Sequence, residues 1–158
     1  MRLFFALWPP RETALALERW ARALDGRCTP ADRIHLTLAF LGETEADRAM
    51  LAARRVQATG FRLPLEEAAH WGHNKIIWAG PRALPAELAH LVEALQMELY
   101  KEGFILERRP FAAHVTLLRK AAAQSLPALP RLEWPAKEFA LVVSAGGAYR
   151  TLERFPLG

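Results

Sequence analysis

The chain has 158 residues, of which 52% are hydrophobic and 24% charged, with a formal net charge of +4 at pH 7. This composition excludes a disordered chain, and the length allows one domain or two joined small lobes, but not two independent large domains. No stretch approaches the roughly 20 apolar residues that cross a bilayer, and residues 1–10 lack a secretory cleavage pattern, so we expect a cytoplasmic protein without membrane contact.

The single cysteine and the excess of arginine further limit the classes of protein to which the chain can belong. Cys28 has no partner for an intramolecular disulfide or a thiolate metal cage, so the fold depends on its hydrophobic core. Most of the 21 Lys and Arg residues are Arg, whose planar guanidinium suits phosphate, and the pI is about 9.7. This charge is compatible with a polyanionic partner but does not select one, because a compositional bias is the simpler explanation.

The first third of the chain alternates extended and helical patterns. Residues 2–8 are an apolar run that ends at two prolines, which predicts a buried strand. Apolar side chains at helical spacing predict a helix over 13–24, and the β-branched and aromatic content of 33–42 predicts a second strand. A pattern like a capping box at Thr44 predicts a second helix over 44–56.

Short extended segments around one long helix make up the remainder. An apolar face at helical spacing predicts a helix over 85–102, with Gly103 as its C-terminal stop. A hairpin turn is expected at 72–74 and an irregular, Pro-rich connection at 124–135. The predicted strands are 61–65, 68–71, 75–79, 111–118, 139–144 and 149–152.

This order of short strands, hairpin turns and helices predicts an α+β fold. Antiparallel sheets with helices packed on their outer side account for it better than a long parallel wound sheet. The sequence contains neither a GxGxxG nor a GxxxxGK[ST] loop, so nucleoside triphosphate chemistry has little support.

Two similar four-residue words recur about half the chain apart. One is HLTL, from His35 to Leu38, and the other is HVTL, from His114 to Leu117. Strand alternation places His35 and Thr37 on one face and puts Leu36, Leu38 and Phe40 on the other; His114 and Thr116 likewise share a face. A single copy is most simply structural, whereas two copies in equivalent strands predict two pseudo-symmetric lobes that face one another.

These residue types suit one kind of chemistry. Histidine titrates near pH 6.5, so of two histidines in one cleft one can act as a base and the other as an acid. Threonine hydroxyls on the same face can donate hydrogen bonds to phosphate oxygens. Together they suit in-line opening of a phosphodiester, in which one imidazole deprotonates water and the other protonates the leaving oxygen. The scheme requires no metal.

The two words and their surroundings resemble the two-histidine phosphoesterase superfamily, whose motifs are two H-x-[ST]-x words. More closely, the chain resembles the RNA 2′,3′-cyclic phosphodiesterases, formerly described as 2′-5′ RNA ligases. The resemblance extends over most of the chain. It includes RLFFALWPP at 2–10, IHLTLAFLGE at 34–43, KIIWAGP at 75–81, GFILERRPFAAHVTLLRK at 103–120, and the segment 149–157.

The resemblance implies a bilobal two-histidine phosphoesterase fold formed by residues 1–158 as a single domain. Each lobe would be an antiparallel sheet with outer helices, and each would carry one word at the central cleft. The family reaction opens a terminal 2′,3′-cyclic phosphate on RNA and leaves a 2′-phosphomonoester. By this resemblance His35 is the proton donor, His114 is the proton acceptor, and Thr37 and Thr116 hold the phosphate. We expect a monomer that acts on RNA ends or small cyclic nucleotides without a metal or cofactor.

Arg119 matches an arginine that often follows the second motif of the family and would bind phosphate. Strict strand alternation, however, puts it on the face opposite His114, so it can contribute only if the strand ends or bulges near Leu118. Two positions depart from the family pattern: Arg33 stands where Asn is frequent, and Ala113 replaces a common Pro. The departures leave the catalytic groups in place but leave substrate preference open.

Other chemically suggestive residues have simpler explanations. The pair His70 and His73 is more consistent with a polar hairpin than with a metal site. Phe5, Trp78 and Tyr149 are candidates for a wall on which bases stack, although burial in the core is the simpler explanation for each.

Arg108 and Arg109 form a short basic run that would flank the mouth of the cleft. If so, replacing both with Ala weakens RNA binding and its dependence on salt. Two alternative functions also remain open at the level of sequence. They are reversible 2′-5′ RNA ligation by the same groups, and RNA binding without turnover on the same fold.

Overall fold

A computed structural model describes residues 1–107 and 109–158. Its helices are α1 (Arg11–Arg22), α2 (Ala46–Arg54) and α3 (Ala86–Lys101), with a short 3-10 helix at Ala31–Arg33. Its strands are β1 (Arg2–Leu7), β2 (Arg27–Cys28), β3 (Leu36–Glu43), β4 (Phe61–Arg62), β5 (Glu67–Trp71), β6 (Ile76–Gly80), β7 (Val115–Arg119), β8 (Pro135–Ala136), β9 (Glu138–Ala145) and β10 (Ala148–Pro156).

The strands form antiparallel sheets, which confirms the predicted α+β class. In the described chain an eight-stranded sheet runs in the order β10-β9-β1-β3-β7-β6-β5, with β2 added against β7, and β4 and β8 form a separate small sheet. The large sheet has two halves, β10-β9-β1-β3 and β7-β6-β5 with β2. Among the described residues, the ladder between β3 and β7 consists of a single pair, Leu36 with Val115. We call this pair the seam.

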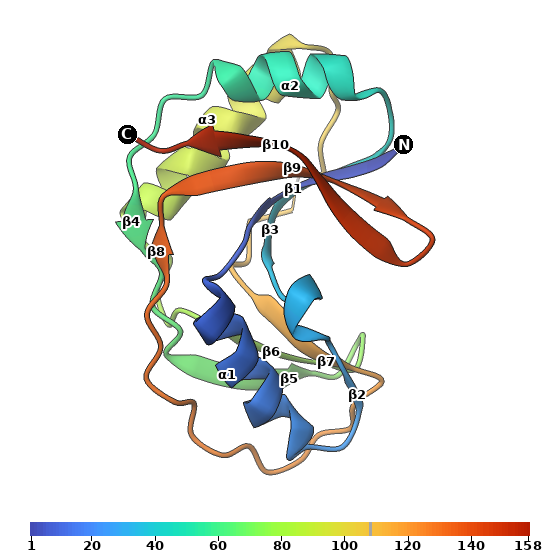
Figure 1. The fold of residues 1–158 in the computed structure, drawn as a ribbon, viewed down its shortest axis with the longest axis vertical. Coiled ribbons are helices and arrows are strands. Elements are labelled where there is room, and N and C mark those ends of the chain that lie inside the picture. The colour runs from blue at the N-terminus through green and yellow to red at the C-terminus, as the bar shows by residue number, and fades with distance from the viewer. Residues whose placement is uncertain (108) are drawn as a thin grey trace.

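Helices cover both halves, but the chain crosses from one half to the other to place them. Helix α1 follows β1 in sequence, yet it packs against β7 and β2 of the other half. Helix α3 follows β6 and contacts β3, and α2 contacts α3 and β10. Figure 1 shows α2 and α3 beside β9 and β10 at the top, with α1 over the lower half. Each half is therefore covered by a helix that follows, in the sequence, a strand of the other half.

One hydrophobic core runs beneath both halves. The predicted apolar face of α3 is buried, as are Phe5 and Leu36 from one half and Ile77 and Leu117 from the other, and all belong to one contiguous cluster. Full burial of such a side chain stabilises the fold by about 1.5–3 kcal/mol each. None of the described helices is both long enough and apolar enough to cross a membrane.

Several element boundaries differ from the sequence prediction. Strand β3 begins at Leu36 rather than at residue 33, because Ala31–Arg33 form a 3-10 turn. The predicted capping box at Thr44 does not form: α2 begins after Glu45 without a side-chain cap. The Thr44 amide instead donates to the Met1 carbonyl at 2.8 Å, which extends the pairing of β1 with β3.

Candidate active site

The seam determines where the two words meet. Leu36 and Val115 are directly opposite each other and fully buried, so the residues before and after them face away from the core. An antiparallel pair has a local two-fold axis, which here relates His35 to His114 and Thr37 to Thr116. The same register brings each histidine toward the threonine of the other word.

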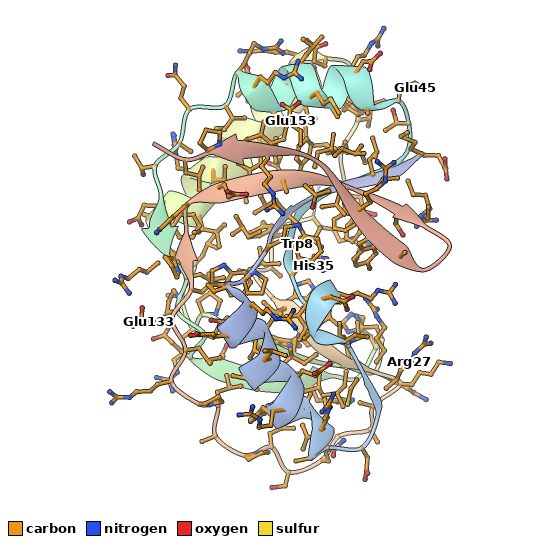
Figure 2. The ribbon with its side chains drawn as sticks, viewed as in Figure 1. Trp8, Arg27, His35, Glu45, Glu133 and Glu153 are labelled. Carbon is orange, nitrogen blue, oxygen red and sulfur yellow. The ribbon has the colours of Figure 1, made fainter. Side chains whose placement is uncertain are left out.

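The five predicted site residues line one cavity of about 470 Å³; they are His35, Thr37, His114, Thr116 and Arg119. The cavity receives side chains from both halves of the sheet. In Figure 2, His35 lies beside Trp8 in the middle of the molecule, where the two halves meet. The cavity therefore has the residues and the position that the sequence pattern predicts for a cleft between lobes.

The His35 ring is held by hydrogen bonds at both nitrogens. Its Nδ1 lies 2.7 Å from the Arg33 carbonyl oxygen, which can only accept, so Nδ1 carries the proton. Its Nε2 lies 2.9 Å from the Thr37 hydroxyl oxygen. In the neutral ring Nε2 accepts from Thr37, and in the cation it donates. This geometry directs the atom that exchanges protons into the cavity.

Three aromatic rings pack against His35 and leave it only partly exposed, at the wall of the cavity. The ring centroids of Phe4, Trp8 and Tyr149 lie 5.0, 5.5 and 5.5 Å from that of His35. This burial is the largest cause that lowers the pKa of His35 below 6.5, because it disfavours the charged form. The hydrogen bond to the Arg33 carbonyl opposes this shift, and the positive charge of Arg119 adds to it. Burial therefore favours the neutral form of His35 in the free protein.

His114 has the same backbone hydrogen bond in different surroundings. Its Nδ1 donates to the carbonyl of Ala112 at 2.8 Å, the equivalent of the bond from His35 to Arg33. The ring makes an edge contact with Trp71 at 4.7 Å between centroids. Both histidines therefore share one tautomer, with Nε2 left for chemistry.

Two β-bulges explain how Arg119 reaches the cavity and why one sequence expectation is wrong. In β7, Thr116 and Leu118 pair with the adjacent residues Trp78 and Ile77, so Leu117 is an extra residue. The bulge reverses the alternation and turns Arg119 to the face of Thr116. This is the condition that the sequence set for Arg119 to join the site.

The equivalent bulge in β3 turns Phe40 into the cavity. Thr37 and Ala39 pair with the adjacent residues Ala6 and Phe5, so Leu38 is the extra residue. Phe40, expected on the apolar face with Leu38, is 72% exposed instead and lines the cavity. Phe40 and Arg119 each stand five residues after a motif histidine, so the bulges place them at equivalent points.

Sequence reasoning missed several residues of the cavity and left two others open. Arg27 and Cys28 line it from β2, a strand too short to have a recognisable pattern. Arg33 and Tyr149 also line it, with the guanidinium carbon of Arg33 4.8 Å from the centre of the Tyr149 ring. One position that departs from the family pattern therefore lies at the cavity itself.

The other candidates lie elsewhere. Phe5 is fully buried in the core, and His70 Nε2 bonds the Ala121 carbonyl at 2.7 Å. Arg109 pairs with Glu107 at 3.1 Å and does not line the cavity, whereas Arg108 lies outside the described residues. Within 1–107 and 109–158, no group of three or more His, Cys, Asp or Glu side chains is arranged to hold a metal ion.

An antiparallel α+β fold that brings one His-x-Thr word from each half to a shared cavity defines the class of two-histidine phosphoesterases. The family model of the 2′-5′ RNA ligase superfamily matches residues 9–148. The chain belongs to this superfamily.

Named relatives match nearly the whole chain. An RNA 2′,3′-cyclic phosphodiesterase of Escherichia coli is 36% identical, and the match covers 95% of this chain and 90% of the relative. One from Thermus thermophilus is 34% identical, with 99% and 90% covered. The structure of E. coli LigT complexed with 3′-AMP superposes with a TM-score of 0.90 at 34% identity, covering 99% of this chain and 97% of that one.

Proposed function

We propose that the protein is an RNA 2′,3′-cyclic phosphodiesterase, which hydrolyses a terminal 2′,3′-cyclic phosphate to a 2′-phosphomonoester. The observation that carries this proposal is the convergence of His35, Thr37, His114 and Thr116 on one cavity. Relatives with this activity in their names, 34–36% identical over 90% or more of each chain, support it.

The cyclic phosphate binds across the seam. The hydroxyls of Thr37 and Thr116 donate to its non-bridging oxygens, and Arg119 offers a planar pair of N–H donors from the far end of β7. The sheet backbone positions Thr37 and Thr116 before the substrate arrives, so their hydroxyls can stabilise the charge that develops on the phosphoryl oxygens with little reorganisation.

Two proton transfers complete the reaction. His114 Nε2 accepts a proton from water, whose oxygen attacks phosphorus in line with the bond to the ribose 3′ oxygen. That bond breaks as His35 donates its Nε2 proton to the 3′ oxygen, so the phosphate remains on the 2′ oxygen. Because burial lowers the pKa of His35 and favours its neutral form in the free protein, the proton that His35 donates must be taken up when the substrate binds. The negative charge of the bound substrate favours protonation of His35 before the bond to the 3′ oxygen breaks.

The proposal also covers the domain organisation, the oligomeric state, the substrates and the location of the enzyme. Because each half supplies one histidine, residues 1–158 act as one bilobal domain, and a monomer is sufficient for catalysis. The substrates are RNA ends or small cyclic nucleotides in the cytoplasm. The scheme uses protein groups alone, without a metal or cofactor.

Product analysis tests hydrolysis against its alternatives. An isotope-labelled RNA with a 2′,3′-cyclic phosphate end is incubated in excess EDTA, alone and with an RNA acceptor that has a 5′-hydroxyl. We expect a product one water heavier that carries a 2′-phosphate, and little joined product. A dominant joined product identifies a 2′-5′ ligase, and tight binding without either product identifies an RNA-binding module.

A further inference from the structure

The cavity contains a pair of arginines that fold stability does not explain. Arg27 of β2 and Arg119 of β7 are directly opposite each other on neighbouring strands, and both line the cavity. Like charges at such positions destabilise a sheet. Within the described parts of the chain, neither guanidinium has a carboxylate within ion-pair distance, whereas Arg54, Arg55 and Arg154 do. An anionic ligand would neutralise the pair.

The cavity carries more positive charge than one phosphodiester neutralises. Its described lining includes three arginines, Arg27, Arg33 and Arg119, and no Asp or Glu. The reacting cyclic phosphate brings one negative charge. The volume of about 470 Å³ also lies within the range of roughly 300–1,000 Å³ that is usual for ligands of nucleotide size. Both charge and volume leave room for a second phosphate.

Arg27 lies further from the reacting centre than Arg119. Strand β2 pairs with the last two residues of β7, at the end away from the seam. In Figure 2, His35 lies in the interior of the molecule, whereas Arg27 lies at its outer edge beside β2. The positive groups that lower the pKa of His35 are Arg119, His114 and Arg33, and Arg27 is not among them. Arg27 thus lines the cavity at a point away from His35.

We propose that Arg27 binds a second phosphate of the substrate, the phosphodiester on the 5′ side of the terminal nucleotide. The inference rests on the proposed function, in which Arg119 and the two threonines hold the cyclic phosphate. It makes Arg27 a specificity determinant: the enzyme distinguishes an RNA end, which has this phosphodiester, from a cyclic mononucleoside, which lacks it.

A chemical double-mutant cycle tests the contact. Wild type and Arg27→Gln are compared on adenosine 2′,3′-cyclic phosphate, on the ApA dinucleotide with a 2′,3′-cyclic end, and on the same dinucleotide with a neutral methylphosphonate linkage. Arg131→Gln is the matched control, because Arg131 is exposed in the connection before β8 and lies outside the cavity. Thermal unfolding of each variant checks that the fold is retained.

We expect Arg27→Gln to lower kcat/KM about tenfold on the charged dinucleotide and to change it less than about twofold on the mononucleoside, as one lost phosphate contact implies. The kcat/KM of wild type should fall by a similar factor when the linkage is made neutral, whereas the kcat/KM of Arg27→Gln should not fall further. Equal losses on the mononucleoside and dinucleotide, or no loss on either, would overturn the inference.

A binding measurement separates this inference from the proposed function. If wild type hydrolyses none of these substrates, the proposed function fails. Calorimetry with 2′-AMP and with ApA carrying a 2′-phosphate then shows whether Arg27 contacts the second phosphate. If Arg27→Gln weakens binding of the dinucleotide but not of 2′-AMP, the contact is supported. Equal affinities of wild type and variant for the dinucleotide contradict it.

Discussion

At the scale of single residues, His35 and His114 have matching backbone hydrogen bonds but unequal surroundings. Each Nδ1 donates to the carbonyl two residues earlier, at 2.7 and 2.8 Å. His35 in addition bonds Thr37 and packs against three aromatic rings, whereas the aromatic contact of His114 is with Trp71. The local two-fold symmetry that relates the two words therefore does not extend to the side chains packed around them, and the two histidines are not equivalent.

The first prediction concerns the titration of His35 in the free protein. Because burial lowers its pKa, its ring signals should titrate below pH 6.5 in an NMR pH series, with His35→Ala used for assignment. The unfolded chain binds this proton near 6.5 and the folded chain only at lower pH. Stability should therefore fall as pH drops from 6.5 through the folded value. A midpoint at or above 6.5 would contradict the burial argument.

The second prediction concerns Arg119. Its charge lowers the pKa of His35, so Arg119→Gln should move the His35 midpoint upward, although it stays below 6.5 because burial is the larger cause. The same change should lower kcat/KM on a cyclic-phosphate substrate by about tenfold to a hundredfold, as a charge-assisted contact is lost. Arg131→Gln should alter neither quantity. An unmoved midpoint would place the Arg119 charge away from His35.

At the scale of elements, Gly80 allows the segment before His114 to pass close to β6. A Cβ at Gly80 would lie 2.6 Å from the Ala113 carbonyl oxygen, so that backbone would have to move. Gly80→Ala should lower the free energy of unfolding by about 1–3 kcal/mol and reduce turnover, since Ala113 immediately precedes His114.

Gly72→Ala is the matched control for this third prediction. Gly72 lies in the turn between β5 and β6, where a Cβ would meet no atom within 4 Å. Chemical denaturation and steady-state kinetics of both variants measure the effects. Equal stability and turnover for Gly80→Ala and wild type would show that the close approach does not position His114.

The elements also show where the sequence stopped being informative. Strand alternation was sufficient to bring both His-x-Thr pairs to one face, because Leu36 and Val115 behave as regular strand residues. It was not sufficient beyond the words, since the bulges at Leu38 and Leu117 depend on pairing with β1 and β6. Phe40 was therefore assigned to the wrong face. Strand β2 contributes Arg27 through pairing with β7, which no local pattern in two residues reveals.

At the scale of the whole molecule, the two halves share one core although their ladder is a single pair in the described chain. Buried residues of β1 and β3 lie in the same cluster as those of β6 and β7, and α1 and α3 each cross between halves. The sequence predicted the two lobes from the repeat. The sequence did not predict that helices are exchanged between the halves, because α1 and α3 have apolar faces that either half could cover.

The fourth prediction follows from this shared core. The chain should unfold in one cooperative transition, with equal calorimetric and van't Hoff enthalpies in differential scanning calorimetry. Breaking the core on one side removes packing from the other, so neither half should melt alone. Two resolved transitions would contradict the proposal of a single domain.

The central claim is that His35 and His114 act together on one cyclic phosphate. Its most direct test is kcat on a cyclic-phosphate RNA in excess EDTA for wild type, His35→Ala, His114→Ala and the double variant. His90→Ala, on the exposed side of α3, is the control. Each single change should cost about 10²–10⁴-fold, and the double variant little more than the worse single one, because the groups act as a unit. Turnover near the wild-type rate by either single variant would contradict the claim.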